Sequence, residues 1–316
     1  MIERQHRPRH VTLLGPTASG KSAVAFELAS RREEVEILSV DSMSVYRQLD
    51  IGTAKPTKHQ RARVAYHLLD LVDPHEEFSL REFQQAAREA LDGIEERGHR
   101  ALLVAGTALY LRAIVDDLGL PGRWPKVARE LETEAESPDG VARLYARLEE
   151  LDPVAASRIL PGNARRVVRA LEVTIGSGRC FSSFGPGLDV YPPTSFVLAG
   201  IPFDPVAHDE QIETRLRQML VSGLLEEVRS LAARPEGVSR TARQALGYRE
   251  LLAHVEDGAP LEESIAEALR RTKAFARRQW RWFRRDPRVI WLDPSGDVLA
   301  QLLDLWDTNA RLPVGD

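Results

Sequence analysis

The stretch VTLLGPTASGKSAV, residues 11–24, constrains the fold of this chain more than any other segment. Residues 15–22 match the pattern G-x-x-x-x-G-K-[ST] and lie between an apolar, strand-like run and a helix-like run. In this context the backbone N–H groups of the loop and the first turn of the helix face an anion. We therefore predict a phosphate-binding loop made of Gly15, Pro16, Thr17, Ala18, Ser19, Gly20, Lys21 and Ser22.

Other short apolar runs follow at residues 35–40, 101–106, 195–201 and 289–292, and helix-like stretches occupy 21–31 and 80–96. Strands that alternate with helices predict an α/β fold: a P-loop NTPase-like parallel sheet flanked by helices. The runs are apolar throughout, which is typical of strands covered on both faces.

The alternation stops between residues 121 and 192, where helical segments at 126–136, 140–151 and 164–175 precede the Gly/Ser/Pro-rich loop GSGRCFSSFGPG. We predict an inserted all-helical domain at 121–192. Residues 1–120 and 193–316 then form the α/β core, whose C-terminal part is mostly helical.

Composition narrows the class of protein. The net charge of -4 at pH 7 does not by itself predict a nucleic-acid partner. Cys180 stands alone, so neither a disulfide within the chain nor a cysteine-based zinc site is possible, and a reducing cytoplasm is expected. No apolar run approaches the roughly 20 residues that span a membrane, and the polar N-terminus lacks the apolar segment of a secretory signal.

Nucleotide-hydrolysing enzymes with a phosphate loop usually have a second strand that ends in an acidic Mg²⁺ ligand, and the best candidate strand here has none. The run at 101–106 ends in Gly106 and Thr107 with no carboxylate, whereas Asp41 follows the run at 35–40. Ligands bind at the carboxyl edge of such sheets, so Asp41 is expected to face the same crevice as Lys21. A turn or helix-capping role for Asp41 is the alternative. A diphosphate loop beside a base suggests transfer of the group attached to the diphosphate.

Residues 264–286 contain no Pro or Gly and predict one long helix. Its arginines fall within an arc of roughly 140° at about 100° per residue: Arg270, Arg271, Arg277, Arg278, Arg281, Arg284 and Arg285. A face of one charge sign predicts binding to a nucleic-acid backbone, with a membrane surface as the weaker alternative. A second cluster, Arg165, Arg166 and Arg169, lies in the insert and fits either a solvent-facing surface or a ligand-binding one.

Several motifs together resemble the bacterial tRNA dimethylallyltransferases, also called tRNA isopentenyltransferases. They read GPTASGKS (15–22), DSMSVYRQLDIGTAKP (41–56), AGTALYL (105–111), RRVVRALEV (165–173), ALGYREL (245–251) and FARRQWRWFRR (275–285). They follow the order of the family along nearly the whole chain.

The resemblance implies transfer of the dimethylallyl group of dimethylallyl diphosphate to N6 of the adenosine 3′ to the tRNA anticodon. The phosphate loop and Mg²⁺, ligated by Ser22, would neutralise the leaving diphosphate, and Arg215 would add positive charge. Asp41 would accept the N6 proton, Thr107 would position the amine or a phosphate oxygen, and the adenine would flip out of its stack.

The resemblance also implies that the anticodon stem-loop binds between core and insert of a cytoplasmic, monomeric enzyme. The tRNA contacts expected by family position, together with the basic helix, are Asp41, Ser42, Met43, Ser44, Thr107, Arg129, Arg165, Arg166, Arg169, Arg277, Arg278 and Arg281.

Some positions depart from the family pattern. Ala105 and Ala108 replace two glycines, and we expect their methyl groups to lie near the crevice and tighten the approach of the backbone. Arg165 replaces a glutamine, Asn163 an aspartate, and Tyr66 the first of two histidines.

Three other functions compete with tRNA prenylation. Prenyl transfer to free AMP, ADP or ATP would require neither the arginine face nor the insert. A P-loop kinase or ATPase is disfavoured by the missing carboxylate after residue 106. An RNA-binding protein without catalysis is disfavoured by the presence of Lys21, Ser22, Asp41, Thr107 and Arg215.

Overall fold

The computed structural model describes residues 10–185 and 187–309. The chain divides into two compact units, Asp117–Pro192 and the remainder, Met1–Asp116 with Pro193–Asp316. The larger unit carries the α/β fold and the smaller is helical. None of the described residues of the smaller unit forms a strand.

The larger unit is built on one six-stranded sheet in the order β3-β2-β4-β1-β5-β6, and every pair of neighbours is parallel. This arrangement confirms the predicted fold class. The strands are β1 (Val11–Leu14), β2 (Val35–Val40), β3 (Tyr66–His67), β4 (Arg100–Ala105), β5 (Val197–Gly200) and β6 (Val289–Trp291). Tyr66–His67 was not predicted as a strand because two residues without an apolar run give no periodic signal.

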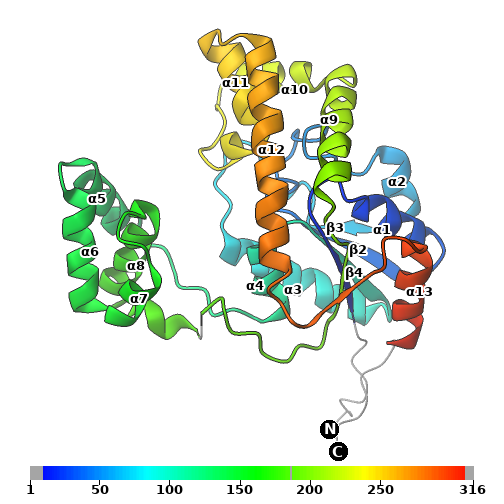
Figure 1. Ribbon diagram of the computed structural model, residues 1–316, viewed down its shortest axis with the longest axis horizontal. Helices are drawn as coiled ribbons and strands as arrows, with labels where there is room; N and C mark the ends of the chain where they lie inside the picture. The colour runs from blue at the N-terminus through cyan, green and yellow to red at the C-terminus, as the bar shows by residue number, and fades with distance from the viewer. Residues whose placement is uncertain (1–9, 186, 310–316) are drawn as a thin grey trace, which may run out of the picture. The chain divides into compact units, whose positions relative to one another are not determined.

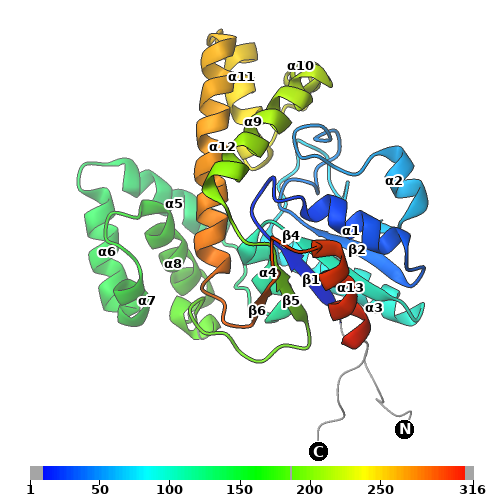
Figure 2. The same ribbon diagram turned by 45° about the vertical axis from the view of Figure 1, so that its right-hand side comes forward.

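Both faces of the sheet are covered, as the uniformly apolar strands predict. Side chains such as Leu13 and Leu102 pack with α1 (Lys21–Ser30) and α13 (Val298–Thr308) on one face. Leu14 and Leu103 pack with α3 (Leu80–Glu96) and α4 (Ala108–Val115) on the other. Figure 2 shows α1 and α13 in front of the strands. The phosphate loop and the turn after β4 lie at the carboxyl edge of the sheet, where ligands bind in folds of this kind.

Four helices stand together to one side of the sheet (Figure 1): α9 (Pro205–Val221), α10 (Leu224–Ala232), α11 (Tyr248–Asp257) and α12 (Leu261–Phe283). Short elements complete this unit: α2 (Lys58–Arg63) and the 3-10 turn Ala242–Gln244. The buried residues of α12 include Ala268, Ala276, Gln279 and Phe283, which form a stripe at helical spacing.

The long basic helix differs from its predicted range of 264–286. It begins three residues earlier, after Pro260, and ends at Phe283. Pro287 favours an extended conformation for the residue before it, and the carboxylate of Asp286 pairs with Arg288 at 2.7 Å. Arg284 and Arg285 therefore lie beyond the helix, so that prediction was wrong for these two residues.

The smaller unit packs four helices around an apolar cluster that includes Leu144 and Leu171. They are α5 (Pro125–Glu136), α6 (Gly140–Leu151), α7 (Pro153–Arg158) and α8 (Ala164–Ser177), followed by a 3-10 turn at Phe181–Phe184. α7 was not predicted, because its six residues are too few to give a clear helical pattern. Within the described part of the chain, no helix has the length and apolar character needed to cross a membrane.

Candidate active site

The phosphate loop joins β1 to α1 as the motif predicts. Gly20 caps α1 with a φ of 80°, a left-handed conformation that glycine adopts without steric cost. The amide of Gly15 donates to the carbonyl of Ala105 at 3.3 Å, which ties the start of the loop to the end of β4. The first turn of α1, with its free N–H groups, thus opens at the carboxyl edge of the sheet.

Lys21 and Arg215 bring two positive charges to this loop. Nζ of Lys21 donates to the carbonyl of Pro16 at 3.0 Å, and Nη1 of Arg215, from α9, donates to Oγ1 of Thr17 at 3.4 Å. Burial and the nearby Arg215 lower the pKa of Lys21 to about 8, against an opposing effect of Asp41. Among the described residues, no carboxylate forms an ion pair with either cation. The pair is therefore suited to an anionic ligand.

Asp41 follows β2 directly, and its two oxygens have different surroundings. Oδ1 accepts hydrogen bonds from the amides of Met43 at 2.7 Å and Ser44 at 3.3 Å, as in a turn. Oδ2 has no hydrogen-bond partner among the described residues. One oxygen thus shapes the local turn and the other is available to a ligand, so the turn and base interpretations are compatible.

The turn between β4 and α4 completes the site. A Cβ placed on Gly106 would lie 3.7 Å from Oδ2 of Asp41, 3.7 Å from Cε of Lys21 and 3.4 Å from Nε2 of Gln279. Gly106 therefore marks the place where these side chains converge. Thr107 precedes α4, and its hydroxyl makes no hydrogen bond within the described residues. The structure brings together Lys21, Asp41, Gly106, Thr107 and Arg215.

Gln279 belongs to this site, although the sequence analysis gave it no role. It lies in the buried stripe of α12 and is 6 % exposed. Its Oε1 accepts from the amide of Thr17 at 2.8 Å, and its Nε2 donates to the carbonyl of Gly106 at 2.5 Å. The only sign of this role in the sequence is that Gln279 is polar at a position of the helix where the spacing predicts an apolar residue.

A second polar side chain, that of Glu227, orders the segment after Asp41. The carboxylate of Glu227 accepts from the amides of Asp50, Ile51 and Gly52 at 3.0–3.4 Å and from the hydroxyl of Tyr248 at 2.5 Å. Tyr248 lies in the motif ALGYREL, and Gly52 lies in the motif that begins at Asp41. Two motifs far apart in sequence are thus joined through Glu227.

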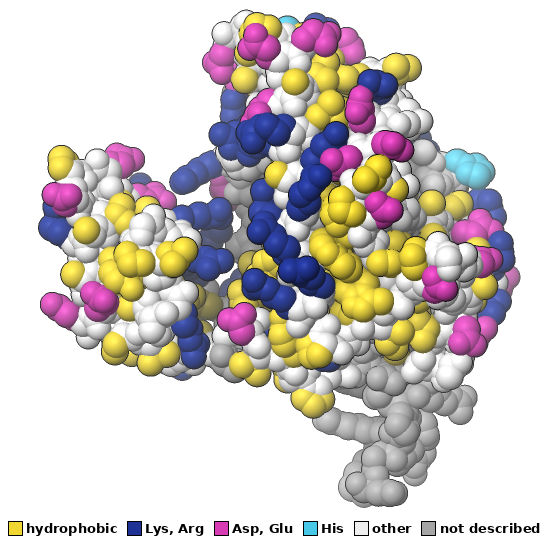
Figure 3. Space-filling view, in the orientation of Figure 1, with side chains coloured by type: hydrophobic (Ala, Val, Ile, Leu, Met, Phe, Trp, Pro, Cys, Tyr) yellow, Lys and Arg dark blue, Asp and Glu magenta, His cyan; other side chains and the backbone are white. Residues whose placement is uncertain are grey.

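The arginine face of α12 is less uniform than the sequence predicts. Figure 3 shows Lys and Arg side chains in a band along this helix. Three of them pair with carboxylates at 2.6–2.8 Å: Arg270 with Glu267, Arg271 with Glu250 and Arg277 with Asp209. Arg278 lies over the ring of Phe275, and exposed Arg281 has no ion pair among the described residues.

Comparison with known proteins assigns the family. The model of the IPP transferase family matches residues 44–286, which is more than half of the chain. A tRNA dimethylallyltransferase of Streptomyces coelicolor is 45% identical over 291 residues, which cover 92% of this chain and 91% of the relative. The chain belongs to the IPP transferase family. This confirms the resemblance seen in the sequence motifs.

Solved structures of this family share its fold. A full-length tRNA isopentenylpyrophosphate transferase from Bacillus halodurans has a TM-score of 0.67 and 34% identity, covering 96% of this chain and 95% of its own. A eukaryotic dimethylallyltransferase described as acting on tRNA has a TM-score of 0.75 and 25% identity, covering 96% and 77%. As a member of the IPP transferase family, the chain is a prenyl-transferring enzyme.

The smaller unit of this IPP transferase carries the other predicted contacts. Arg165 and Arg166 are exposed on α8, and Arg129 is an exposed residue of α5 whose Nε donates to the carbonyl of Pro125 at 3.3 Å. Arg169 instead pairs with Glu172 at 2.7 Å and donates to the carbonyls of Pro121 and Gly122. Arg169 thus has partners inside its own unit, whereas Arg165 and Arg166 present their guanidinium groups to solvent.

The structure shows where three of the residues that depart from the family pattern lie. Ala105 and Ala108 flank Gly106 and Thr107, and both pack in the apolar cluster with α3 and α4. Alternate side chains of β4 face opposite sides of the sheet, and Ala105 shares its side with Leu103. The effect of their methyl groups on the crevice stays a prediction. Asn163 caps α8, as an aspartate would, by accepting from the amide of Arg166 at 3.3 Å.

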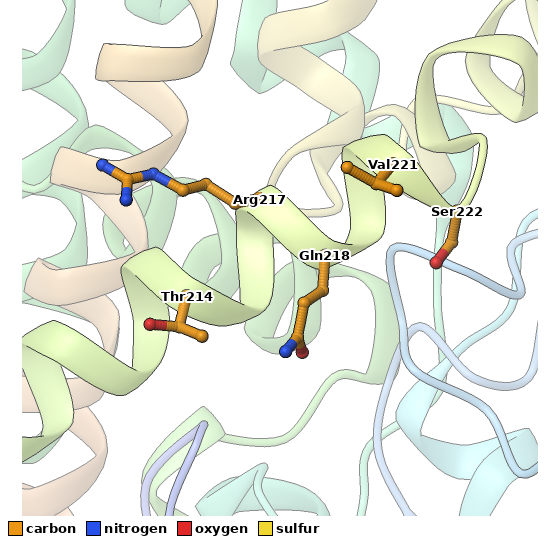
Figure 4. A pocket seen from close by; sticks show the side chains of 5 residues that line it. All are labelled: Thr214, Arg217, Gln218, Val221 and Ser222. Atoms are coloured by element: carbon orange, nitrogen blue, oxygen red, sulfur yellow. The ribbon is translucent and has the colours of Figure 1, made fainter.

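A shallow recess on α9 is not part of this site (Figure 4). It is lined by Thr214, Arg217, Gln218, Val221 and Ser222, and none of these is a predicted site residue. No group of three or more His, Cys, Asp or Glu residues that could hold a metal occurs in residues 10–185 and 187–309.

Proposed function

We propose that this enzyme transfers the dimethylallyl group of dimethylallyl diphosphate to N6 of the adenosine 3′ to the anticodon in tRNA. One observation supports this most: two cations without carboxylate partners stand at a phosphate loop, opposite the free oxygen of Asp41 across Gly106. The names of its relatives supply the acceptor, since they are tRNA dimethylallyltransferases.

The reaction assigns a role to each side chain. The C1–O bond of the allylic diphosphate breaks, its electron pair leaves with the diphosphate, and N6 of the adenine forms the new bond to C1. Lys21, Arg215 and the loop amides stabilise the growing negative charge. Oδ2 of Asp41 accepts the N6 proton, and the Thr107 hydroxyl orients the amine or a phosphate oxygen.

The site suits Mg²⁺ bound mainly through the substrate. The Ser22 hydroxyl is exposed at the start of α1 and has no hydrogen-bond partner within the described residues. Mg²⁺ commonly takes one or two protein ligands and completes its shell with phosphate oxygens and water. When bound, Mg²⁺ would offset the charge of the diphosphate. We propose Ser22 as its protein ligand.

The tRNA contacts divide between the two units. In the larger unit we propose Ser42, Met43 and Ser44 near the adenosine, and Arg277, Arg278 and Arg281 along the backbone. In the smaller unit we propose the helical insert as a second tRNA-binding surface through Arg129, Arg165, Arg166 and Arg169. We further propose a cytoplasmic monomer.

The test is incubation of the purified chain with dimethylallyl diphosphate, Mg²⁺ and either unmodified tRNA or AMP. We expect a mass increase of one dimethylallyl group on the tRNA nucleoside next to the anticodon and none on AMP. Modified AMP without modified tRNA would assign the enzyme to adenylate prenylation. Inertness toward both acceptors would refute prenyl transfer.

A further inference from the structure

The buried side chain of Gln279 connects the two halves of the site. Its Oε1 accepts a hydrogen bond from the amide of Thr17 in the phosphate loop, and its Nε2 donates one to the carbonyl of Gly106, next to Thr107. The two bonds use both functional groups of the amide, so the O and N positions are fixed by their partners. Neither Glu nor Met could make both bonds, because a carboxylate lacks the donor and a thioether lacks the amide.

These two hydrogen bonds affect the distance between Asp41 and Lys21. The ideal Cβ position of Gly106 lies within 3.7 Å of Nε2 of Gln279, Oδ2 of Asp41 and Cε of Lys21. A displacement of the Gly106 turn would therefore change the spacing between the base and the cation at the diphosphate. Transfer reactions depend strongly on such spacing, and an error of about 1 Å can reduce the rate about 100-fold.

The hydrogen bond to Gln279 also occupies the amide of Thr17. It donates to Oε1 of Gln279 at 2.8 Å and so points toward α12. The amides of Gly15 and Ser19 donate instead to the carbonyls of Ala105 and Pro16, at 3.3 Å each. Gln279 is therefore part of what sets the shape of the loop.

Gln279 further connects the site to the basic surface of α12. Arg278 and Arg281 are exposed on the same helix, within one turn of Gln279. An RNA backbone held by these arginines would be attached rigidly to the phosphate loop and to the Gly106 turn. The same residue thus sets the position of both substrates.

We propose that Gln279 is a positioning residue for prenyl transfer, which holds the phosphate loop and the Gly106–Thr107 turn at the separation that the reaction needs. The inference rests on the proposed function. It assigns Gln279 no contact with either substrate. Its loss should therefore lower kcat and leave substrate binding nearly intact.

The test compares Gln279→Met and Gln279→Glu with the wild-type enzyme under saturating donor and tRNA. We expect kcat to fall about 30–100-fold in both, with the Kd for tRNA and the KM for dimethylallyl diphosphate within about threefold of wild type. Gln218→Met on α9 serves as the matched control, because Gln218 lies outside the site. Thermal unfolding establishes that each variant is folded at the assay temperature.

The outcomes separate this inference from the proposed function. A wild-type enzyme that is inactive on every acceptor refutes the proposed function, whatever the variants do. An active wild type with kcat within twofold in folded Gln279→Met refutes the positioning role. So does a loss of activity that saturating donor restores, because that pattern indicates a binding role.

Discussion

Lys21 and Lys55 are two lysines with contrasting surroundings in the same unit. The Lys55 side chain is 1 % exposed, and its Nζ lies 2.8 Å from Asp50 and 2.6 Å from Asp70 and donates to the carbonyl of Tyr46. Lys21 has the Pro16 carbonyl as its hydrogen-bond acceptor and another cation, Arg215, nearby. A buried charge with carboxylate partners holds structure, whereas one without them favours an anionic ligand.

Loss of Asp41 should have the largest effect on catalysis. Asp41 contributes negative charge near Lys21, and its Oδ2 lies close to the Gly106 turn. We expect Asp41→Ala to reduce kcat about 10²–10⁴-fold, the usual contribution of a general base, and to leave tRNA affinity within a few-fold. Single-turnover assays and filter binding measure the two quantities. Near wild-type activity would show that Asp41 is not the base.

Exchange of each lysine for methionine tests the comparison directly. We expect Lys21→Met to lower kcat about 10²–10³-fold with little change in the free energy of unfolding. Lys55→Met should instead destabilise the fold by about 2 kcal/mol, because Asp50 loses its partner and Asp70 keeps only Arg61, while both carboxylates remain partly exposed to water.

Urea unfolding and steady-state kinetics separate these two roles. Kinetics of Lys55→Met are taken at a temperature where the variant is fully folded, and activity there should remain within a few-fold of wild type. The comparison fails if Lys21→Met is the less stable variant or if folded Lys55→Met is the less active one.

The low pKa of Lys21 predicts how pyrophosphate affinity depends on pH. Free Lys21 loses its proton around pH 8, and the bound anion favours the protonated form. Affinity should therefore be level below about pH 7 and fall toward tenfold per pH unit well above 8. Isothermal titration with Mg²⁺ and inorganic pyrophosphate measures this, and Lys21→Met corrects for titration of the ligand. Identical pH profiles for the two proteins would contradict the assignment.

The smallest effect is expected from the exposed arginines of α12. Arg278→Ala combined with Arg281→Ala should weaken tRNA binding several-fold and reduce the slope of log affinity against log salt by about 1–2. Arg277→Ala should do less, because Arg277 already pairs with Asp209. Arg229→Ala, from an exposed pair with Glu226, is the control. An unchanged salt slope in the double variant would remove this face from the tRNA interface.

Much of the fold was predictable because its signals are local. The strands β2 and β4 and the helix Leu80–Glu96 were predicted to within a residue. A strand buried on both faces is a continuous apolar run, and a helix buried on one face has apolar residues at helical spacing, so both can be recognised from consecutive residues. The short elements β3 and α7 were missed because two and six residues carry too little pattern. The helix ending at Phe283 was predicted three residues too far toward the C-terminus, because Pro287 disfavours a helical conformation for the residue before it.

The phosphate loop, the parallel α/β core and the family could be predicted from the sequence alone, because each depends on contiguous residues in a fixed order. The tertiary structure was needed to show which arginines of α12 have carboxylate partners and that Gln279 joins Thr17 to Gly106. The Thr17 partner lies 262 residues from Gln279 in the chain. Hydrogen bonds between such distant residues leave no periodic signal, because they depend on how packed elements meet and not on their own spacing.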